Sequence, residues 1–125
     1  MEITPLVPEN RQIVQSYGIG RFKVSQIEYE SSIIVLPLRT LSWTVKAHND
    51  INYRNLAPIL EEDTKIDILL IGCGKSMRLL PRDFSERWRQ NNVAVDVMDT
   101  GAACRTYNIL SAEGRRVAAA LIALD

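Results

Sequence analysis

Apolar residues follow two different patterns in the two halves of this chain. Between residues 13 and 45, short runs rich in β-branched and aromatic residues alternate with turn residues, which is typical of β-strands. We expect these runs to form an antiparallel meander with strands over residues 21–24, 26–29, 33–36 and 41–45. Residues 1–11 carry two prolines and little periodicity, so we expect a loosely held N-terminal arm there.

The second half of the chain reads as strands alternating with helices. A near-continuous apolar run over residues 66–71 predicts a strand buried on both faces, and residues 93–98 predict another. Pro81 suits the first turn of the helix between them, where its missing N–H is not needed. Phe84 and Trp88 of that helix would cover the sheet. The order strand, helix, strand predicts a parallel pair joined by a right-handed crossover.

Three further elements follow from capping residues and composition. Asn52 is a suitable N-cap for a helix over residues 53–62, with Leu56, Ile59 and Leu60 on its inner face. Thr100 would cap a third helix that runs through Glu113, and Gly114 would end it. Residues 116–122 are ambiguous, because alanine favours a helix while the short apolar run after a glycine allows a buried strand. We favour the strand.

Composition and charge narrow the class of protein. The 125 residues are 46% hydrophobic and 24% charged, with 15 basic and 15 acidic residues, as expected for one globular α/β domain over residues 1–125. A nucleic-acid-binding protein would usually carry a basic excess, and the local cluster of Arg78, Arg82, Arg87 and Arg89 reads as a solvated helix face. The chain has two cysteines, which are too few for a secreted disulfide scaffold, and no apparent signal peptide. No apolar stretch approaches the roughly 20 residues that would span a bilayer. We therefore expect a cytoplasmic protein that is not transmembrane.

The turn after the first buried strand is the first candidate site. Gly72, Cys73, Gly74 and Lys75 follow the apolar run, and glycines there would leave backbone N–H groups uncovered at the carboxyl end of the sheet. A P-loop would need a glycine at position 69, and a dinucleotide fingerprint would need one at position 77. Leucine and methionine stand there, so both motifs fail. The N–H groups and Lys75 could still hold a small anion or a partner's carboxylate; a tight structural turn is the simpler interpretation.

The second candidate site is the start of the third helix. Thr100, Arg105, Thr106 and Asn108 offer hydrogen-bond donors near a helix N-terminus, which attracts anions. If the two strands are parallel neighbours, this helix start lies beside the Gly72 turn, and we expect Arg105 to point into the cleft between them. The alternative is a capped helix whose small residues pack close to the sheet.

Other reactive residues give weaker signals. Cys73 and Cys104 would lie at the same end of the sheet, where they could form a redox pair or a low-pKa thiol, although a free cysteine is more often a buried apolar residue. His48 is the single histidine, and no second cluster supports a metal site. We find no complete catalytic set and expect no cofactor.

Several landmarks together resemble a known family. The match is carried by the apolar strand with Gly72 and Gly74, Leu80-Pro81, residues 95–100, Ala102-Ala103, residues 106–108 and residues 113–121. They resemble the domain of unknown function that a mitochondrial respiratory complex I assembly factor shares with bacterial and archaeal homologues of Mth938-like fold. The resemblance implies a three-layer α/β fold around a mixed five-stranded sheet with the last strand antiparallel. It also implies an extra β-layer from the N-terminal meander, and it supports a strand over residues 117–122.

Two hypotheses of function follow. The first is a non-enzymatic protein-binding or assembly-factor-like module, linked to biogenesis of a membrane respiratory complex. Its partner would be a protein such as a membrane-complex subunit, met at the periphery of the inner membrane. The alternative is a small-molecule or anion-binding protein, or an undiscovered enzyme. In either case the candidate binding residues are Gly72, Cys73, Gly74, Lys75, Thr100, Arg105, Thr106 and Asn108.

Overall fold

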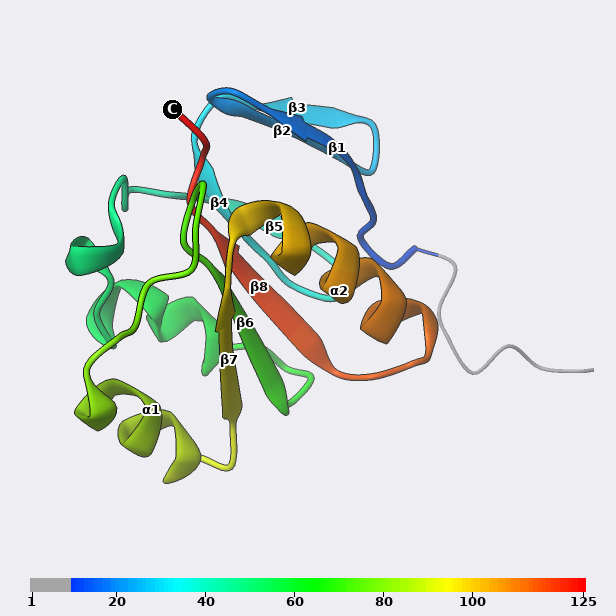
Figure 1. The fold of residues 1–125 in the computed structure, drawn as a ribbon. Helices are drawn as coiled ribbons and strands as arrows, with labels where there is room; N and C mark the ends of the chain where they lie inside the picture. Colours follow the sequence, from blue (N-terminus) through cyan, green and yellow to red (C-terminus); the bar gives the residue numbers. More distant parts are fainter. Residues whose placement is uncertain (1–9) are drawn as a thin grey trace, which may run out of the picture.

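The computed structural model describes residues 10–125. They are built around a five-stranded sheet, whose strands can be followed in Figure 1. Its strand order is β5-β4-β8-β6-β7, with bounds Thr40–Trp43, Ser32–Val35, Val117–Leu121, Ile68–Gly72 and Ala94–Met98. β6 pairs in parallel with both β7 and β8, which confirms the parallel pair expected from the sequence. The sheet is mixed, as the resemblance implied. The last strand, β8, is antiparallel to β4 on one side and parallel to β6 on the other.

The first three strands form a separate layer. β1 (Val14–Gly18), β2 (Arg21–Val24) and β3 (Ile27–Tyr29) make an antiparallel sheet in the order β1-β2-β3. The expected antiparallel meander is therefore confirmed for β1–β3, but its extension to residue 45 is wrong, because β4 and β5 join the large sheet instead. All four residues of β4 are buried, and a strand buried on both faces is stable in the interior of a sheet rather than at the end of a small meander.

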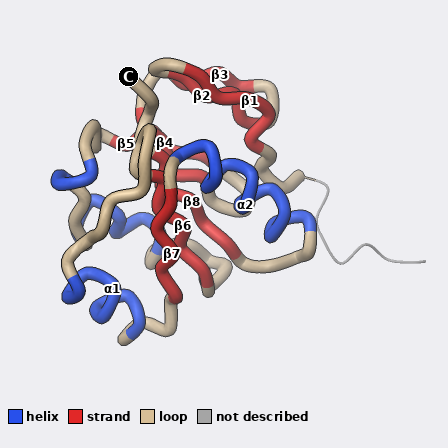
Figure 2. Tube along the Cα trace, in the orientation of Figure 1, coloured by secondary structure: helices blue, strands red, loops and turns tan. Residues whose placement is uncertain are grey.

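Helices cover both faces of the large sheet (Figures 1 and 2). α2 (Thr100–Ala112) and the small sheet share one core with β8, in which Phe22, Ala103 and Tyr107 are buried. α1 (Arg82–Arg89) and the 3-10 helix η2 (Arg54–Ile59) share the other core, which contains Phe84 and Trp88 as expected. A second short 3-10 helix, η1, spans His48–Asp50. The three-layer architecture with an extra β-layer is thereby confirmed.

The expected helix over residues 53–62 is shorter and tighter than its pattern suggested. It is the 3-10 helix η2, and Pro58 inside it has no N–H to donate to an α-helical bond. Leu56 and Ile59 are buried as expected, whereas Leu60 is 41% exposed. Asn52 accepts a hydrogen bond through Oδ1 from the backbone N of Asn55 at 2.8 Å, so it orders the start of this turn.

The ends of α2 differ from expectation at one residue. Asp99, rather than Thr100, caps the helix, and its side chain accepts a hydrogen bond from the backbone N of Ala102. Gly114 follows the helix with φ of 82°, the left-handed conformation expected of a helix-ending glycine. The arginines of the local basic cluster are exposed, in agreement with a solvated face. Between residues 10 and 125, no helix is long and apolar enough to cross a bilayer.

Candidate functional site

The Gly72 turn and the start of α2 meet at the carboxyl end of the sheet, as the sequence predicted. A Cβ atom on Gly72 would lie 2.9 Å from Cα of Thr100 and 3.1 Å from a side-chain carbon of Leu121. Glycine is therefore needed at this position for α2 to begin directly against the strand. Gly74 has φ of 92°, a conformation that residues with a side chain rarely adopt.

Hydrogen bonds close this junction from within. The backbone N of Gly74 donates to Oγ1 of Thr100 at 2.8 Å, and the backbone N of Thr100 donates to the carbonyl of Gly74 at 2.9 Å. The Thr100 hydroxyl donates in turn to the carbonyl of Ile122 at 2.7 Å, and the N of Cys73 donates to the carbonyl of Met98 at 2.9 Å. The expectation of uncovered N–H groups is therefore wrong for Cys73 and Gly74, because the protein itself provides their acceptors.

The remaining candidate residues point to other parts of the molecule. Arg105 is exposed and donates through Nη1 to the hydroxyl of Tyr17 on β1 at 2.9 Å, so it faces the small sheet instead of the cleft between the turns. Asn108 accepts from the backbone N of Val14 at 2.9 Å and donates to its carbonyl at 2.8 Å, which fixes β1 against α2. Thr106 lies half-buried on the same helix, and Lys75 is exposed beside the Gly72 turn.

The two cysteines have the chemistry of buried apolar residues. Both are free and buried. Burial raises the pKa of the Cys73 thiol, although hydrogen bonding to the backbone of Arg78 and the charge of Arg78 act in the opposite direction. Burial also raises the pKa of Cys104 from 9.0 to about 12, against a smaller opposing effect of the Arg105 charge. The favoured interpretation of both cysteines as buried apolar residues is therefore confirmed, and the alternative of a low-pKa thiol is wrong, since desolvation outweighs the nearby cations.

A cavity of about 640 Å³ was not predicted from the sequence, and its lining includes neither the Gly72 turn nor the start of α2. It opens where residues 123–125 leave the sheet, next to the end of β5 and the β1–β2 turn. Trp43 and Leu124 provide apolar surface, and Ser42 and Thr44 provide hydroxyls. The charged lining residues are one cation, Lys46, and two carboxylates, Glu30 and Asp125. Ser42 on β5 and Thr44 just after it alternate with apolar residues, which is visible in the sequence, but the cavity itself joins segments that are far apart in the chain.

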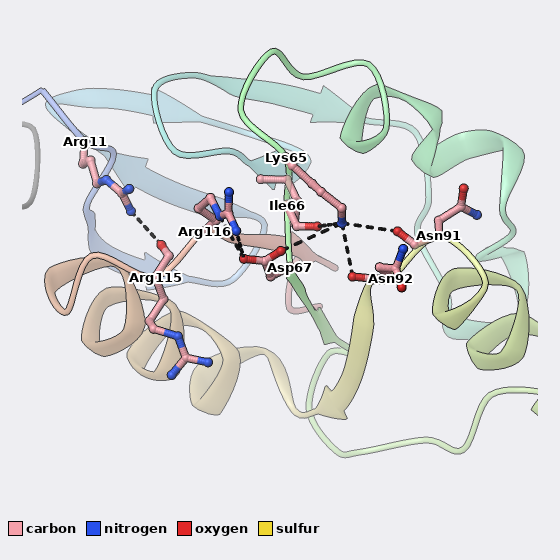
Figure 3. A network of polar contacts seen from close by, with 8 residues as sticks. All are labelled: Arg11, Lys65, Ile66, Asp67, Asn91, Asn92, Arg115 and Arg116. Atoms are coloured by element: carbon pink, nitrogen blue, oxygen red, sulfur yellow. Dashed lines mark hydrogen bonds and ion pairs between the residues drawn. The ribbon is translucent and has the colours of Figure 1, made fainter.

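The opposite end of the sheet is held by an exposed polar network (Figure 3). Arg116, just before β8, donates through Nε and Nη2 to Oδ2 of Asp67, both at 2.8 Å. Nζ of Lys65 donates to the carbonyls of Asn91 and Asn92 at 3.3 and 3.2 Å, which ties the start of β6 to the turn before β7. These contacts connect the start of β6 to the segments before β7 and β8, so we interpret the network as structural. Among residues 10–125, no group of three or more His, Cys, Asp or Glu side chains is placed to hold a metal ion.

Comparison with known proteins identifies relatives over most of this fold. The family described as "Protein of unknown function (DUF498/DUF598)" matches residues 14–122. A relative from Danio rerio, named NADH dehydrogenase (ubiquinone) 1 alpha subcomplex assembly factor 3, is 34% identical over 110 residues. These are 88% of this chain and 63% of the relative. The chain thus spans less than two thirds of that protein's length.

Solved bacterial structures share the fold along most of their length. A crystal structure from Bordetella parapertussis superposes with a TM-score of 0.84 at 36% identity, covering 93% of this chain and 99% of the other. A solution structure from Bordetella pertussis, described as a Mth938-like domain, gives 0.79 at 30% identity and covers 98% and 92%. The resemblance inferred from the sequence landmarks is confirmed.

Proposed function

We propose, from the premise that this chain belongs to the DUF498/DUF598 family, that it is a protein-binding module acting as an assembly factor for a membrane-bound respiratory complex. The observation that carries the proposal is the 34% identity, over 88% of this chain, to a protein named as an NADH dehydrogenase 1 alpha subcomplex assembly factor. The module would bind an extramembrane surface of a subunit during assembly, at the periphery of the inner membrane. It would hold that surface without transforming it chemically.

The surface around the Gly72 turn supports binding to a protein. The donors of Cys73 and Gly74 are already used internally, so the turn offers side chains rather than backbone groups to a partner. Beyond it, Met77 is 52% exposed and Leu79 is 85% exposed, in the same loop as the exposed Lys75. Apolar side chains beside a cation suit a protein surface that carries both apolar groups and a carboxylate. We propose Lys75 and the adjoining loop as part of the partner-binding surface.

The proposal is tested by capture from the native cell. A tagged protein, expressed from its own locus and recovered from detergent extracts, should enrich respiratory-complex subunits in quantitative mass spectrometry. Deletion of the gene should reduce the assembled complex on native gels, and the wild-type gene should restore it. The proposal would be overturned if the tagged strain yielded no more of those subunits than an untagged control strain and if the deletion strain contained normal amounts of the assembled complex.

Charge-reversal variants locate the partner surface. Lys75→Glu should reduce capture of the subunits at least several-fold without lowering the melting temperature, since the side chain is exposed. Lys46→Glu is the matched control, because Lys46 is an exposed lysine that lines the 640 Å³ cavity instead. Loss of capture with Lys46→Glu alone would move the partner surface from the Gly72 turn to the cavity.

The cavity supports a second candidate function, the binding of a small molecule. Its volume of about 640 Å³ lies within the usual range of ligand pockets, and it combines apolar walls with hydroxyls, one lysine and the carboxylates of Glu30 and Asp125. Because two carboxylates stand against one lysine, an amphipathic amine would match that lining. Thermal-shift measurements with aliphatic and aromatic amines should raise the melting temperature of the wild type more than that of Glu30→Gln. Equal shifts in both proteins, or none at millimolar ligand, would reject this function.

A further inference from the structure

The outer edge of β7 carries backbone groups that the fold leaves unused. β7 is an edge strand of the large sheet (Figure 1). Ala94 donates from its backbone N to the carbonyl of Asp67, and the carbonyl of Met98 accepts from the N of Cys73. Because residues of a parallel strand alternate in the side to which they bond, Ala94, Asp96 and Met98 bond to β6. Val95 and Val97 therefore direct their N–H and C=O groups away from the sheet.

These outward groups have no backbone partner among residues 10–125. A hollow of about 520 Å³ follows the first part of the same edge, along Val93, Ala94 and Val95, with Ser85 and Arg89 of α1 beside it. An extended chain lying there could reach the edge of β7 and continue the hydrogen-bond ladder of the sheet. The side chains of Val95 and Val97 pack against the core that contains Trp88, so the strand offering these groups is held rigidly.

The charge on this edge discriminates between possible occupants. Asp96 is exposed at the centre of β7, between the two outward-bonding valines, and it makes no ion pair within the described part of the chain. Two copies of this chain could pair through their β7 edges as antiparallel strands. If that pair were symmetric and used the outward N–H and C=O groups of both valines, Val95 of one copy would bond to Val97 of the other. The two Asp96 side chains would then lie directly opposite each other, and their like charges would destabilise the pair. A foreign strand with a lysine or arginine at that position would instead gain an ion pair.

We propose that the β7 edge is a docking site for an extended segment of a partner protein. The segment adds to the sheet beside β7, with a basic residue next to Asp96 and apolar residues next to Val95 and Val97. Main-chain hydrogen bonds to the two valines supply the affinity, and the alternation of apolar and basic side chains supplies the specificity. This inference rests on the proposed protein-binding function and adds to the Lys75 loop a second surface, with a stated partner chemistry.

A phage library of random linear heptapeptides provides the probe. The library is panned on the wild-type protein, and enriched peptides are synthesised and titrated into ¹⁵N-labelled protein. We expect enriched sequences with Lys or Arg between apolar residues, and chemical-shift changes and amide protection centred on Val95 and Val97. No enrichment, or shift changes confined to other elements, would overturn the inference.

Two variants test the mechanism of binding. Val95→Pro removes an outward N–H while the bond between Ala94 and Asp67 remains, so it should weaken the selected peptides at least tenfold. Ser42→Pro is the control at the other edge strand, β5, where the same alternation directs Ser42 outward; it should leave their affinity unchanged. Asp96→Lys is the second variant in case Val95→Pro does not fold, because Asp96 is exposed and its replacement should leave the fold intact. It should abolish binding of basic peptides. Unchanged affinity in folded Val95→Pro or in Asp96→Lys would refute the proposed geometry.

The experiments separate this inference from the assembly role. Capture of respiratory subunits that persists in Asp96→Lys and in folded Val95→Pro would reject the β7 edge and leave the assembly role intact. Peptides that bind β7 as described, with no respiratory subunit captured from the cell, would reject the assembly role and leave the docking edge intact.

Discussion

Replacing Gly72 with alanine would place a methyl group where the backbone of α2 begins. The new Cβ would lie 2.9 Å from Cα of Thr100 and 3.1 Å from its Oγ1. Because the closest atom belongs to the backbone, a change of side-chain rotamer cannot relieve the contact, and the helix start must move. Overpacking of this kind costs about 1–3 kcal/mol. Weakening of the hydrogen bonds that Thr100 makes with Gly74 and Ile122 adds about 1 kcal/mol.

The expected loss in the free energy of unfolding is thus about 2–4 kcal/mol, which for a chain of this length lowers the melting temperature by roughly 6–15 °C. Urea unfolding followed by fluorescence of the buried Trp43 and Trp88 measures it directly. Gly74→Ala is the matched control, because a Cβ there would meet nothing within 4 Å and only the φ of 92° is unfavourable. Its cost should be about 1–2 kcal/mol. A Gly72→Ala variant within 0.5 kcal/mol of the wild type would refute the packing argument.

Three further predictions concern the same region. Thr100→Val keeps the shape of the side chain but leaves one buried N–H and one buried carbonyl without their partner, so it should cost about 2–4 kcal/mol in urea unfolding; a loss below 0.5 kcal/mol would contradict the closed junction. Asn108→Ala removes both hydrogen bonds to the backbone of Val14, so hydrogen exchange should accelerate in β1 and stay unchanged in β6; uniform acceleration would contradict a local role. Burial raises the pKa of Cys104 from 9.0 to about 12, so the stability that the protonated thiol contributes is complete below pH 9.0 and is lost as the pH rises towards 12. The free energy of unfolding of Cys104→Ala should therefore fall less steeply with pH above 9.0 than that of the wild type. An identical fall in both proteins would refute the raised pKa of Cys104.

Much of the α/β half could be predicted because its signals are local. The apolar run before Gly72 fixes a buried strand, and Gly114 adopts the left-handed conformation that ends α2. The N-terminal half was harder, because strand propensity does not specify which strand is the neighbour. β4 does not join the small sheet and pairs instead with β8, a strand more than 80 residues later in the chain. Pro58 was likewise a local signal, and it explains why η2 is a 3-10 helix.

The sequence predicted that the Gly72 turn and the start of α2 meet, but it did not predict that internal hydrogen bonds close their junction. Parallel pairing of β6 and β7 requires their following turns to meet, and they do. Closure of the junction depends on the Thr100 hydroxyl, which bridges the N–H of Gly74 and the carbonyl of Ile122. That bridge involves three segments and could not be inferred from any one of them. The 640 Å³ cavity escaped prediction for the same reason, since its walls come from distant segments.

The places where backbone N–H and C=O groups lack a partner in the described part of the chain indicate what kind of ligand this fold can bind. A ligand at the carboxyl ends of parallel strands needs free backbone donors there, and at Gly74 the donor already has an acceptor inside the protein. At the β7 edge, the N–H and C=O groups of Val95 and Val97 lie on a strand and repeat with its period. A small anion would engage one such group, whereas an extended peptide engages all four in register. A carboxylate at Asp96 in the middle of the row disfavours pairing with a second copy and favours a basic segment. The same fold that closes its turn with internal hydrogen bonds therefore leaves an edge suited to another chain.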